Sequence, residues 1–381
     1  MNIAIDLVGT NLGSGTKTYN LKFLQKISKF NSHYKIYIFC CNDYTRYIDL
    51  NLISENIFIK AKPNFLSKNY IKLFWMQILF PFELFFLNID KLFSPMNYCP
   101  IICKIMKLDI ILGIHSNLPW VFFDKMPGNK IKNYFIKFLM SLSINVCNKL
   151  IVNSNFAKNE IVSLLNLRKE KVHVVYLGTE TIIEKIPKLE SKENINLTYL
   201  TDNNEYILCV SSCVRYHEFL NILKSYKKIL KTTKKNIKFI FVMQILDKKY
   251  YDEIQKFVFL NFKNKEVIFL KNLNKENLDR LYRHALFYIF SSYTEVFGLT
   301  TLEAMKNNCP VMVSNTSALP EINNNSAVYF DPDDISDIQN KMQSLIKNKN
   351  LRNNLKLSGK KNIQKFNWSK TFDETISIIL N

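Results

Sequence analysis

Two carboxylates, Glu295 and Glu303, stand in the most informative part of the chain, with seven residues and a Phe-Gly-Leu turn between them. An apolar run of strand length, FYIFSS, precedes them, TTLEAMKNN has the pattern of a short amphipathic helix, and PVMVSN is typical of a second strand. This order predicts a βαβ crossover in a parallel sheet. The loop at residues 293–300 then follows the carboxyl end of a strand and precedes a helix N-terminus, where phosphorylated ligands bind.

A purely structural explanation exists for part of this segment. Thr300-Thr301-Leu302-Glu303 matches a capping box, in which a Thr hydroxyl and a Glu carboxylate bond to free amides at a helix start. A cap does not require Glu295, and the similarity is longer than a cap. The pattern ExFGLxxxEAMxxxxPVxxSNxSALPE, which starts at Glu295, resembles the donor-site signature of glycosyltransferase family 4, retaining enzymes of the two-domain GT-B fold.

The resemblance implies a role for each carboxylate and for the turn between them. Glu303 would bind hydroxyls of the nucleotide ribose, and Glu295 would bind hydroxyls of the donor sugar. Backbone amides at the start of the helix would face the diphosphate. The donor-binding turn implied in this way consists of Phe297, Gly298, Leu299 and Thr300. The resemblance implies neither an enzymic nucleophile nor a general base, because the leaving phosphate takes the acceptor's proton on the same face.

Two segments of the N-terminal half extend the resemblance. LGSGTKTYNLKFLQKI, residues 12–27, is similar to the family's Gly-rich loop and following helix, with Gly15 at the better-kept glycine position. IHSNLPW, residues 114–120, resembles the loop that carries a donor-facing histidine, which is His115 here. A lone histidine is more often structural, but His115 directly follows the apolar run ILGI, at the end of a strand where ligands bind.

The segment after YILCVSS departs from the family pattern. The family usually has an Arg immediately after this strand and a Lys five positions later, and both bind the donor diphosphate. Here the two positions hold Ser212 and His217, with Arg215 between them. Arg215 has forked donors that suit a phosphate, whereas a histidine is only partly charged near neutral pH. We therefore predict that Arg215 acts with Glu295 and His115 in catalysis, and that His217 belongs to a modified donor site.

Strand and helix patterns alternate along both halves of the chain, which is typical of two α/β domains with parallel sheets. The sequence becomes polar after Gly178, which places a boundary there. The resemblance implies the GT-B fold, with two Rossmann-like parallel-sheet domains facing a cleft. The predicted parts are an acceptor-side domain at 1–178, a nucleotide-sugar-binding domain at 179–365, and a terminal helix at 366–381 that packs back on the first domain.

The charge of the chain is strongly positive, with 52 Lys and Arg against 32 Asp and Glu and a net charge of +20. An excess of this size indicates phosphorylated substrates, anionic lipid or nucleic acid as partners. The lysines are spread along the chain and no nucleic-acid motif is present, so we expect no nucleic acid. The eight cysteines form no Cys-x-x-Cys pairs and most lie in apolar runs, which predicts reduced core thiols of a cytosolic protein and no zinc site.

Two segments combine lysine with aromatic residues. The apolar run LFWMQILFPFELFFL, residues 73–87, is 15 residues long, short of the ~20 that a transmembrane helix requires. Lys68, Lys72 and Lys91 flank it, and KIKNYFIKFLMSLSI, residues 130–144, has a similar composition. Either segment could lie in a membrane interface or form a core-facing helix, and the pattern alone favours neither. The start of the chain, MNIAIDLVGT, has a strand pattern rather than that of a signal peptide, which predicts a protein that is not exported.

These observations predict a metal-independent, retaining glycosyltransferase that transfers a hexosyl group from a UDP-, GDP- or ADP-linked sugar to a saccharide. We expect a lipid-linked acceptor, a role in surface polysaccharide or lipopolysaccharide synthesis, and a cytoplasmic protein held peripherally on an anionic membrane surface. No cofactor is expected, because helix N-termini and Arg or His would stabilise the leaving phosphate. The alternative is a catalytically silent GT-B homologue that binds nucleotide or a partner protein. The two glutamates favour the enzyme, and the replaced basic pair favours the alternative.

Overall fold

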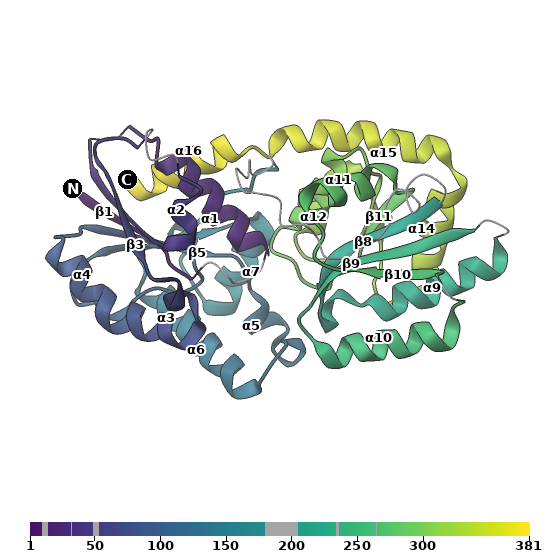
Figure 1. Cartoon of the computed structure of the whole chain (residues 1–381), viewed down its shortest axis with the longest axis horizontal. Helices are drawn as coiled ribbons and strands as arrows, with labels where there is room; N and C mark the ends of the chain where they lie inside the picture. The colour runs from purple at the N-terminus through teal and green to yellow at the C-terminus, as the bar shows by residue number, and fades with distance from the viewer. Residues whose placement is uncertain (10–13, 32, 49–52, 180–204, 234–235, 264) are drawn as a thin grey trace. The chain divides into compact units, whose positions relative to one another are not determined.

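The computed structural model describes residues 1–9, 14–31, 33–48, 53–179, 205–233, 236–263 and 265–381. They form two compact units, each built around a parallel sheet (Figure 1). Unit 1 comprises the described residues of Met1–Trp120, Tyr134–Ile186 and Asn367–Asn381, and unit 2 those of Val121–Asn133 and Pro187–Phe366. The polar segment after Gly178, where we placed the domain boundary, lies outside the described residues from position 180 on. The boundary therefore stays a prediction.

The described part of unit 1 contains a seven-stranded sheet in the order β3-β2-β1-β4-β5-β6-β7, with all neighbouring strands parallel. Apolar runs form its central strands, which are buried on both faces because helices cover the sheet. Its strands are β1 (Asn2–Leu7), β2 (Lys35–Cys41), β3 (Ile57–Lys62), β4 (Lys91–Ser94), β5 (Asp109–Ile114), β6 (Lys149–Val152) and β7 (Val172–Val174).

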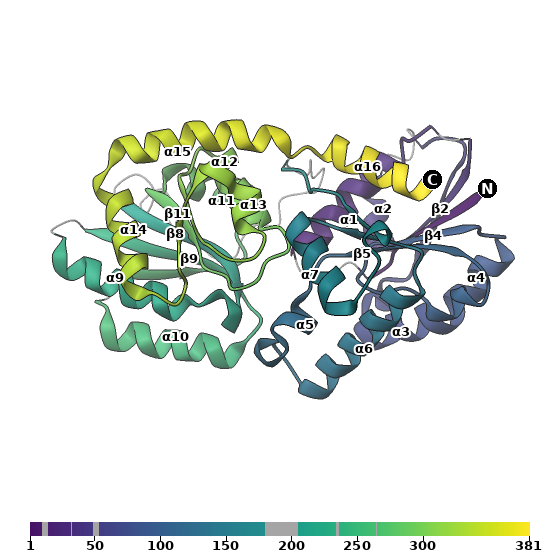
Figure 2. The same ribbon diagram turned by 180° about the vertical axis from the view of Figure 1, so that it is seen from behind.

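The helices of unit 1 include one from the far end of the sequence. They are α1 (Ser14–Ile27), α2 (Asn42–Thr45), α3 (Asn69–Phe74), α4 (Phe80–Phe86), α5 (Leu118–Val121), α6 (Lys130–Val146), α7 (Asn155–Leu165) and α16 (Trp368–Leu380), where α5 and α6 run across the unit limits. α16 lies along α1 in both views of the chain (Figures 1 and 2). Tyr19 and Phe23 of α1 contact it, with the Tyr19 hydroxyl 3.3 Å from that of Thr375 and the Phe23 ring 5.3 Å from that of Phe372.

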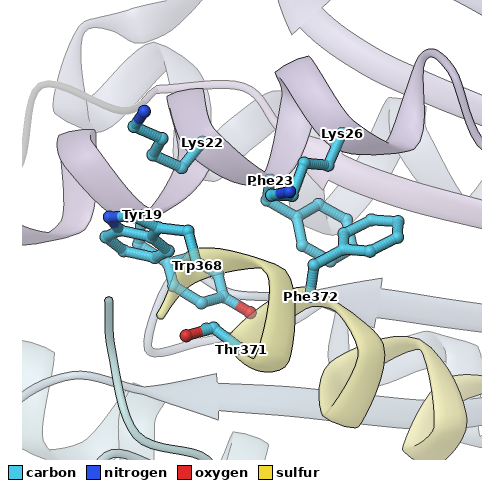
Figure 3. A pocket seen from close by; sticks show the side chains of 7 residues that line it. All are labelled: Tyr19, Lys22, Phe23, Lys26, Trp368, Thr371 and Phe372. Atoms are coloured by element: carbon cyan, nitrogen blue, oxygen red, sulfur yellow. The ribbon is translucent and has the colours of Figure 1, made fainter. Parts of the chain in front are cut away.

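A small pocket lies beside this α1–α16 contact (Figure 3). Aromatic rings and two lysine stems line it: Tyr19, Lys22, Phe23, Lys26, Trp368, Thr371 and Phe372. Gly178 also lies at this contact, where a Cβ would overlap the backbone nitrogen of Trp368. The end of the chain is therefore packed into unit 1 through close backbone and aromatic contacts.

The described part of unit 2 contains a six-stranded sheet in the order β10-β9-β8-β11-β12-β13, also parallel throughout. Its strands are β8 (Glu205–Cys213), β9 (Ile237–Ile245), β10 (Val267–Leu270), β11 (Phe287–Phe290), β12 (Val311–Ser314) and β13 (Ala327–Phe330). Its helices are α9 (Phe219–Thr232), α10 (Lys248–Asn261), α11 (Lys275–His284), α12 (Leu299–Lys306), α13 (Leu319–Asn323), α14 (Ile335–Lys347) and α15 (Lys349–Asn362).

Both sheets reverse their strand order next to their first strand. In unit 1 the reversal lies between β1 and β4, and in unit 2 it lies between β8 and β11. At such a switch point the connections leave in opposite directions, which opens a crevice beyond the carboxyl ends of the two strands. The predicted α/β architecture with two parallel sheets is confirmed, and each sheet has one position where a ligand is expected to bind.

The apolar run at 73–87 forms three helical pieces rather than one. α3 is followed by a π-helical turn at Trp75–Leu79 and then by α4, which has Pro81 in its first turn. Proline has no N–H to donate to the preceding turn, so the regular hydrogen-bond ladder is interrupted there. No helix among the described residues combines the length and apolar character needed to cross a bilayer.

Candidate active site

Three loops of unit 2 are tied together at the carboxyl edge of the sheet. They follow the adjacent strands β8, β11 and β12. The Tyr293 N–H donates to the Tyr216 carbonyl at 2.9 Å, which joins the first two loops. The Ser292 N–H donates to the Ser314 hydroxyl at 3.0 Å, which joins the second and third. The switch point between β8 and β11 is therefore bridged by a fixed network of backbone and hydroxyl groups.

His217 and Glu295 meet at this switch point, with Nε2 of the ring 3.3 Å from Oε1 of the carboxylate. Nδ1 of His217 lies 2.8 Å from the Ser212 carbonyl oxygen and 2.5 Å from the Ser211 hydroxyl. A carbonyl oxygen only accepts, so Nδ1 carries a hydrogen. Nε2 is then the ring nitrogen that faces the carboxylate. The contact joins two side chains that are 78 positions apart in the sequence.

The Glu295 backbone is held as firmly as its side chain. Its N–H donates to the Ser317 hydroxyl at 2.9 Å, and its carbonyl accepts the Ala318 N–H at 3.1 Å. The Ser292 hydroxyl also lies 3.4 Å from the carboxylate. The carboxylate is about a quarter exposed, so it is positioned in advance and still accessible to a ligand.

Gly298 ends this loop in a conformation that favours glycine, with φ at 87°, and it is the N-cap of α12. A Cβ at this position would lie 2.6 Å from the Leu319 side chain, so both the backbone angle and the packing require glycine. The capping-box explanation for residues 300–303 is wrong, because the helix starts at Leu299 and has no side-chain cap bond. The Thr301 hydroxyl bonds to the Gly298 carbonyl at 2.8 Å instead.

Glu303 faces Lys275 at the beginning of α11, with 3.6 Å between the ammonium and the carboxylate. Burial raises the pKa of Glu303, Lys275 partly offsets this effect, and the nearby Asp279 adds to it. Lys275 was not among the residues that sequence reasoning selected. A Lys in a helix start gives no sign of the carboxylate that it will meet on another helix.

The four residues of the predicted donor-binding turn have different environments. Phe297 is buried and packs edge-on against Phe366, with 5.6 Å between the ring centroids. Leu299 and Thr300 are half-buried, and the Thr300 hydroxyl accepts a hydrogen bond of 2.8 Å from the Tyr288 hydroxyl. Phe297 therefore anchors the turn through its buried ring.

Arg215 is already engaged by carboxylates. Its guanidinium makes a bidentate contact to Glu253, at 2.5 and 3.0 Å, and its Nε lies 3.5 Å from Asp247. The carbon of the guanidinium also lies 5.1 Å from the Tyr250 ring centroid. Hydrogen bonding to Glu253 raises the pKa of Arg215 further. The group is thus charged, but α10 supplies its partners and a phosphate would have to compete with them.

In unit 1 the ring of His115 is held by its neighbours. Its Nδ1 lies 2.9 Å from the Asn153 side-chain nitrogen, and its ring centroid lies 4.9 Å from that of Tyr19. Burial lowers the pKa of His115 to about 4, so the ring is neutral at physiological pH. Gly15 lies in the first turn of α1, where an added Cβ would contact no protein atom. The protein itself does not require glycine there, and the loop at residues 10–13 lies outside the described residues.

The surroundings of the site add one further feature. A pocket of about 380 Å³ lies beside β12 and β13, and none of the predicted site residues lines it. Its lining residues are Asn315, Thr316, Tyr329, Phe330, Asp331, Pro332, Asp337 and Lys341. Among the described residues, no group of three or more His, Cys, Asp or Glu side chains is arranged to hold a metal ion.

Comparison with known protein families places the site in a wider group. Residues 190–362 match the family described as glycosyl transferases group 1. This range contains Arg215, His217, Glu295 and Glu303. Gly15 and His115 lie outside it. The C-terminal part of the chain thus carries the similarity to the family, together with the whole network at the switch point of unit 2.

Curated relatives agree with this assignment. The chain is 28% identical to the O-antigen chain mannosyltransferase RfbU of Salmonella typhimurium, over 62% of this chain and 60% of that protein. It is 21% identical to the O-antigen chain mannosyltransferase B of Escherichia coli, over 62% and 61% of the two chains. The chain thus spans about 60% of the length of these relatives.

Solved structures resemble the chain over nearly its full length. The Anabaena protein Alr3699/HepE in complex with UDP and glucose has a TM-score of 0.71 at 13% identity, covering 100% of this chain and 99% of that chain. A glycosyltransferase from Rickettsia africae ESF-5 has a TM-score of 0.68 at 14% identity, with 99% and 97% covered. The two parallel-sheet units therefore have the predicted GT-B fold, and residues 190–362 are similar to the group 1 glycosyl transferases.

Proposed function

We propose that this protein is a retaining glycosyltransferase that transfers a sugar from a nucleotide-sugar to a saccharide acceptor. The observation that carries the proposal is the His217–Glu295 pair at the switch point of unit 2, within the part of the chain that matches the family. Ligands of open α/β sheets bind at such positions. A carboxylate and an imidazole in contact suit a ligand that presents sugar hydroxyls and a phosphate.

Each group at this edge has a distinct task in the proposed reaction. Glu295 accepts hydrogen bonds from hydroxyls of the donor sugar, and Glu303 accepts them from the nucleotide ribose. The free N–H groups of Leu299 and Thr300 face the diphosphate, whose charge grows as the anomeric C–O bond breaks. His217 contacts Glu295, so it is the first candidate to donate a hydrogen bond to the diphosphate, with the Arg215 guanidinium as the second. We also propose, from the sequence resemblance, that His115 acts in catalysis and that Gly15 acts in donor binding.

The relatives support a choice of sugar, acceptor and cellular location. Two of them are named O-antigen chain mannosyltransferases, so a mannosyl nucleotide is the first donor to test. An O-antigen is a surface polysaccharide, which supports a role in polysaccharide or lipopolysaccharide synthesis and a lipid-linked acceptor. We place the protein in the cytoplasm, at the inner face of the cytoplasmic membrane.

A catalytically silent homologue is the second candidate, and the state of Arg215 favours it. Glu253 and Asp247 already neutralise the guanidinium that was predicted to hold the diphosphate. A protein with this arrangement would bind nucleotide through Glu303 and the helix start but would not stabilise the leaving group. The two candidates differ in turnover and not in nucleotide binding.

Thermal unfolding with a nucleotide panel and donor hydrolysis without acceptor test the proposal together. GDP, UDP and ADP, and GDP-mannose and UDP-glucose, are added in turn, and a ligand at about 100 times its dissociation constant raises the free energy of unfolding by roughly 2.7 kcal/mol. Stabilisation by one nucleotide together with hydrolysis of its sugar supports the enzyme. Stabilisation without hydrolysis or transfer supports the silent homologue, and no stabilisation by any of the five contradicts both.

Metal dependence is tested in the same assay. We expect EDTA to change turnover by less than about twofold, because the helix start and cationic side chains meet the charge of the diphosphate. Complete loss in EDTA and recovery with Mg²⁺ would show that a metal ion supplies that charge instead.

A further inference from the structure

Exposed apolar side chains are concentrated on one part of unit 1. Of the 23 large hydrophobic side chains that are exposed among the described residues, 14 lie in this unit between Phe65 and Phe138. This stretch makes up about a fifth of the chain. Single exposed apolar residues are normal on a protein surface, but a contiguous group of this size marks a surface that binds something.

α3, the π-helical turn and α4 turn aromatic rings outward. Phe82 is 61% exposed and Phe86 is 77% exposed, while Trp75 is only 2% exposed. Trp75 packs on Phe80 with 4.5 Å between the ring centroids, and its indole N–H donates to Glu83. The segment therefore has one face in the core and a second apolar face that is exposed among the described residues. The core-helix interpretation holds for the first face, and the membrane-interface interpretation stays a prediction for the second.

α6 has the same double character. Its exposed side chains Ile131, Tyr134, Phe135 and Phe138 recur at the spacing of one helix face. Met140, Ser143 and Ile144 are buried on the other side.

α6 and the α3–α4 segment are linked through residues 99–101. The Cys99 N–H bonds to the Ser143 hydroxyl at 3.2 Å, and Gln77 bonds to the backbone of Cys99 and Ile101, each at 3.0 Å. α3, α4 and α6 also lie side by side in both views (Figures 1 and 2). We call their outward side the aromatic face.

Lysines surround the aromatic face, and carboxylates are scarce on it. The residues of α3, the π-helical turn, α4 and α6 include one carboxylate, Glu83, and the Lys62 ammonium lies 2.5 Å from it. Exposed lysines stand on the same helices or on adjacent turns: Lys68, Lys104, Lys107, Lys130 and Lys132. An apolar face edged with cations is complementary to a bilayer that carries anionic headgroups.

A second copy of the chain fits this face less well than a lipid surface does. Each copy has a net charge of +20, and a symmetric contact would set one ring of lysines against another. An anionic bilayer accepts both parts of the face, because phosphate groups pair with the lysines and acyl chains take up the aromatic rings.

We propose that the aromatic face is the membrane-docking surface of this protein and that its partner is an anionic lipid bilayer. The inference deepens the proposed function, on which it rests for the lipid-linked acceptor. Phe82, Phe86 and Phe138 enter the interface, while Trp75 stays in the core and contributes to stability rather than to binding. Docking thus combines a part that salt screens, from the lysines, with a part that salt does not screen, from the rings.

Co-sedimentation of the full chain with vesicles tests the proposal. The vesicles contain phosphatidylcholine alone or an equimolar mixture with phosphatidylglycerol, at low and high salt. We expect binding to be at least roughly tenfold stronger on the mixed vesicles, and part of it to survive high salt. The variant F82S/F86S/F138S should bind on the order of 10²-fold more weakly and lose the salt-resistant part. The variant K68Q/K104Q/K107Q should lose roughly fivefold per lysine at low salt and little at high salt.

A matched control replaces exposed apolar residues of unit 2, in the variant F259S/L260S/L357S. It should bind vesicles within about twofold of the wild type, since these side chains lie on α10 and α15. Equal loss in this control, full binding by F82S/F86S/F138S, or no binding of the wild type to mixed vesicles would overturn the proposal. So would a dimer that does not bind vesicles and that F82S/F86S/F138S converts to a monomer. If the triple variant does not fold, the single variant F86S should show the same kind of loss of vesicle binding, to a smaller extent.

Nucleotide-induced thermal stabilisation, measured on the same samples, separates this inference from the proposed function. An F82S/F86S/F138S protein that binds nucleotide but not vesicles assigns the loss to the aromatic face. If the wild type binds vesicles but no nucleotide, the docking proposal holds and the proposed function is contradicted.

Discussion

The two switch points of the molecule are built on opposite principles. Between β8 and β11, each charged group that we assign to the site has an opposite charge or a hydrogen-bond partner, and three loops are joined by hydroxyl groups. Between β1 and β4, Asp6 and Lys72 are buried, and neither Oδ2 of Asp6 nor Nζ of Lys72 has a hydrogen-bond partner among the described residues. In the first site the assigned charged side chains have partners within the protein, whereas the second leaves buried polar atoms of Asp6 and Lys72 without a hydrogen-bond partner among the described residues.

The difference between the two switch points indicates which kind of ligand group each sheet edge binds. A satisfied network fixes its side chains in advance, which suits a part of the ligand that does not vary, such as a nucleotide and its diphosphate. Buried groups without partners are costly, and such groups cluster at functional positions. Lys72 also packs against Gly9, where φ is 82° and a Cβ would overlap the lysine stem. Unit 1 therefore keeps a buried carboxyl and a buried amine that interact electrostatically near its switch point.

Removing the buried ammonium should give the largest effect on stability. Burial raises the pKa of Asp6 and lowers that of Lys72, and each charge opposes the shift of the other. Lys72→Met leaves a buried carboxyl without its cation, so we expect the free energy of unfolding in urea to fall by about 3 kcal/mol. The double variant D6N/K72M should recover more than half of this loss. Equal stability of Lys72→Met and the wild type would show that the two groups do not act as a pair.

Glu295→Gln should disrupt the hydrogen-bonded switch point between β8 and β11. The amide keeps the shape but removes the carboxylate that is assigned to the sugar hydroxyls and that faces His217, so turnover should fall on the order of 10²- to 10³-fold. Free nucleotide should bind within about twofold of the wild type, as measured by calorimetry, because this side chain is assigned to the sugar. A variant that loses nucleotide affinity and turnover together would move Glu295 to the nucleotide.

Acid should weaken unit 1 through His115. The pKa of His115 is about 4 in the folded protein, below its ordinary value of 6.5, so between these values the unfolded chain binds a proton that the folded chain does not. Its contribution is complete above pH 6.5 and is lost as the pH falls through 4. In urea unfolding, the stability difference between the wild type and His115→Gln should change by about 2 kcal/mol from pH 7 to pH 5, in the direction that favours the variant at the lower pH. A constant difference would mean that the ring is solvated when folded.

Glu303→Ala should have the smallest of these effects and should separate the two glutamates. We expect the affinity for free nucleotide to fall by roughly 1 to 3 kcal/mol, the range for a lost hydrogen bond to a charged group. Removal of the carboxylate also leaves Lys275 without this partner, so Lys275→Met/Glu303→Ala is the control for lost ion pairing. If Glu303→Ala binds nucleotide as tightly as the wild type, the ribose assignment is wrong.

Most central strands could be predicted from the sequence, and several peripheral elements could not. The apolar runs at β1, β5, β8 and β11 are long or strongly β-prone, so their position in a sheet follows from composition. β3 pairs on one side only, and Lys60 and Lys62 shorten its apolar run, so local composition does not identify it. β13 has four residues and follows a turn-rich segment. These strands exist because β2 and β12 offer them a pairing edge.

In the candidate site, too, residues set by the local sequence could be predicted, whereas contacts between distant segments could not. Gly298 could be selected because a turn before a helix requires a residue with positive φ. The partners of Arg215 could not, since Glu253 lies 38 positions away on another helix and nothing in the local sequence points to it. The contribution of Ser211 and Ser292 to the network was also missed, because serines at the ends of strands are too common to single out.

The sequence by itself determined the two parallel α/β sheets, the βαβ unit that carries Glu295 and Glu303, and the presence of apolar helices rich in Phe and Lys. These features depend on residue types within about twenty positions, where periodicity and turn chemistry act. Only the tertiary structure decided that His217 meets Glu295, that Lys72 is buried beside Asp6, and that Phe82 faces outward while Trp75 faces the core. Strand order and helix rotation set these contacts, and both result from packing the whole chain rather than from any one segment of it.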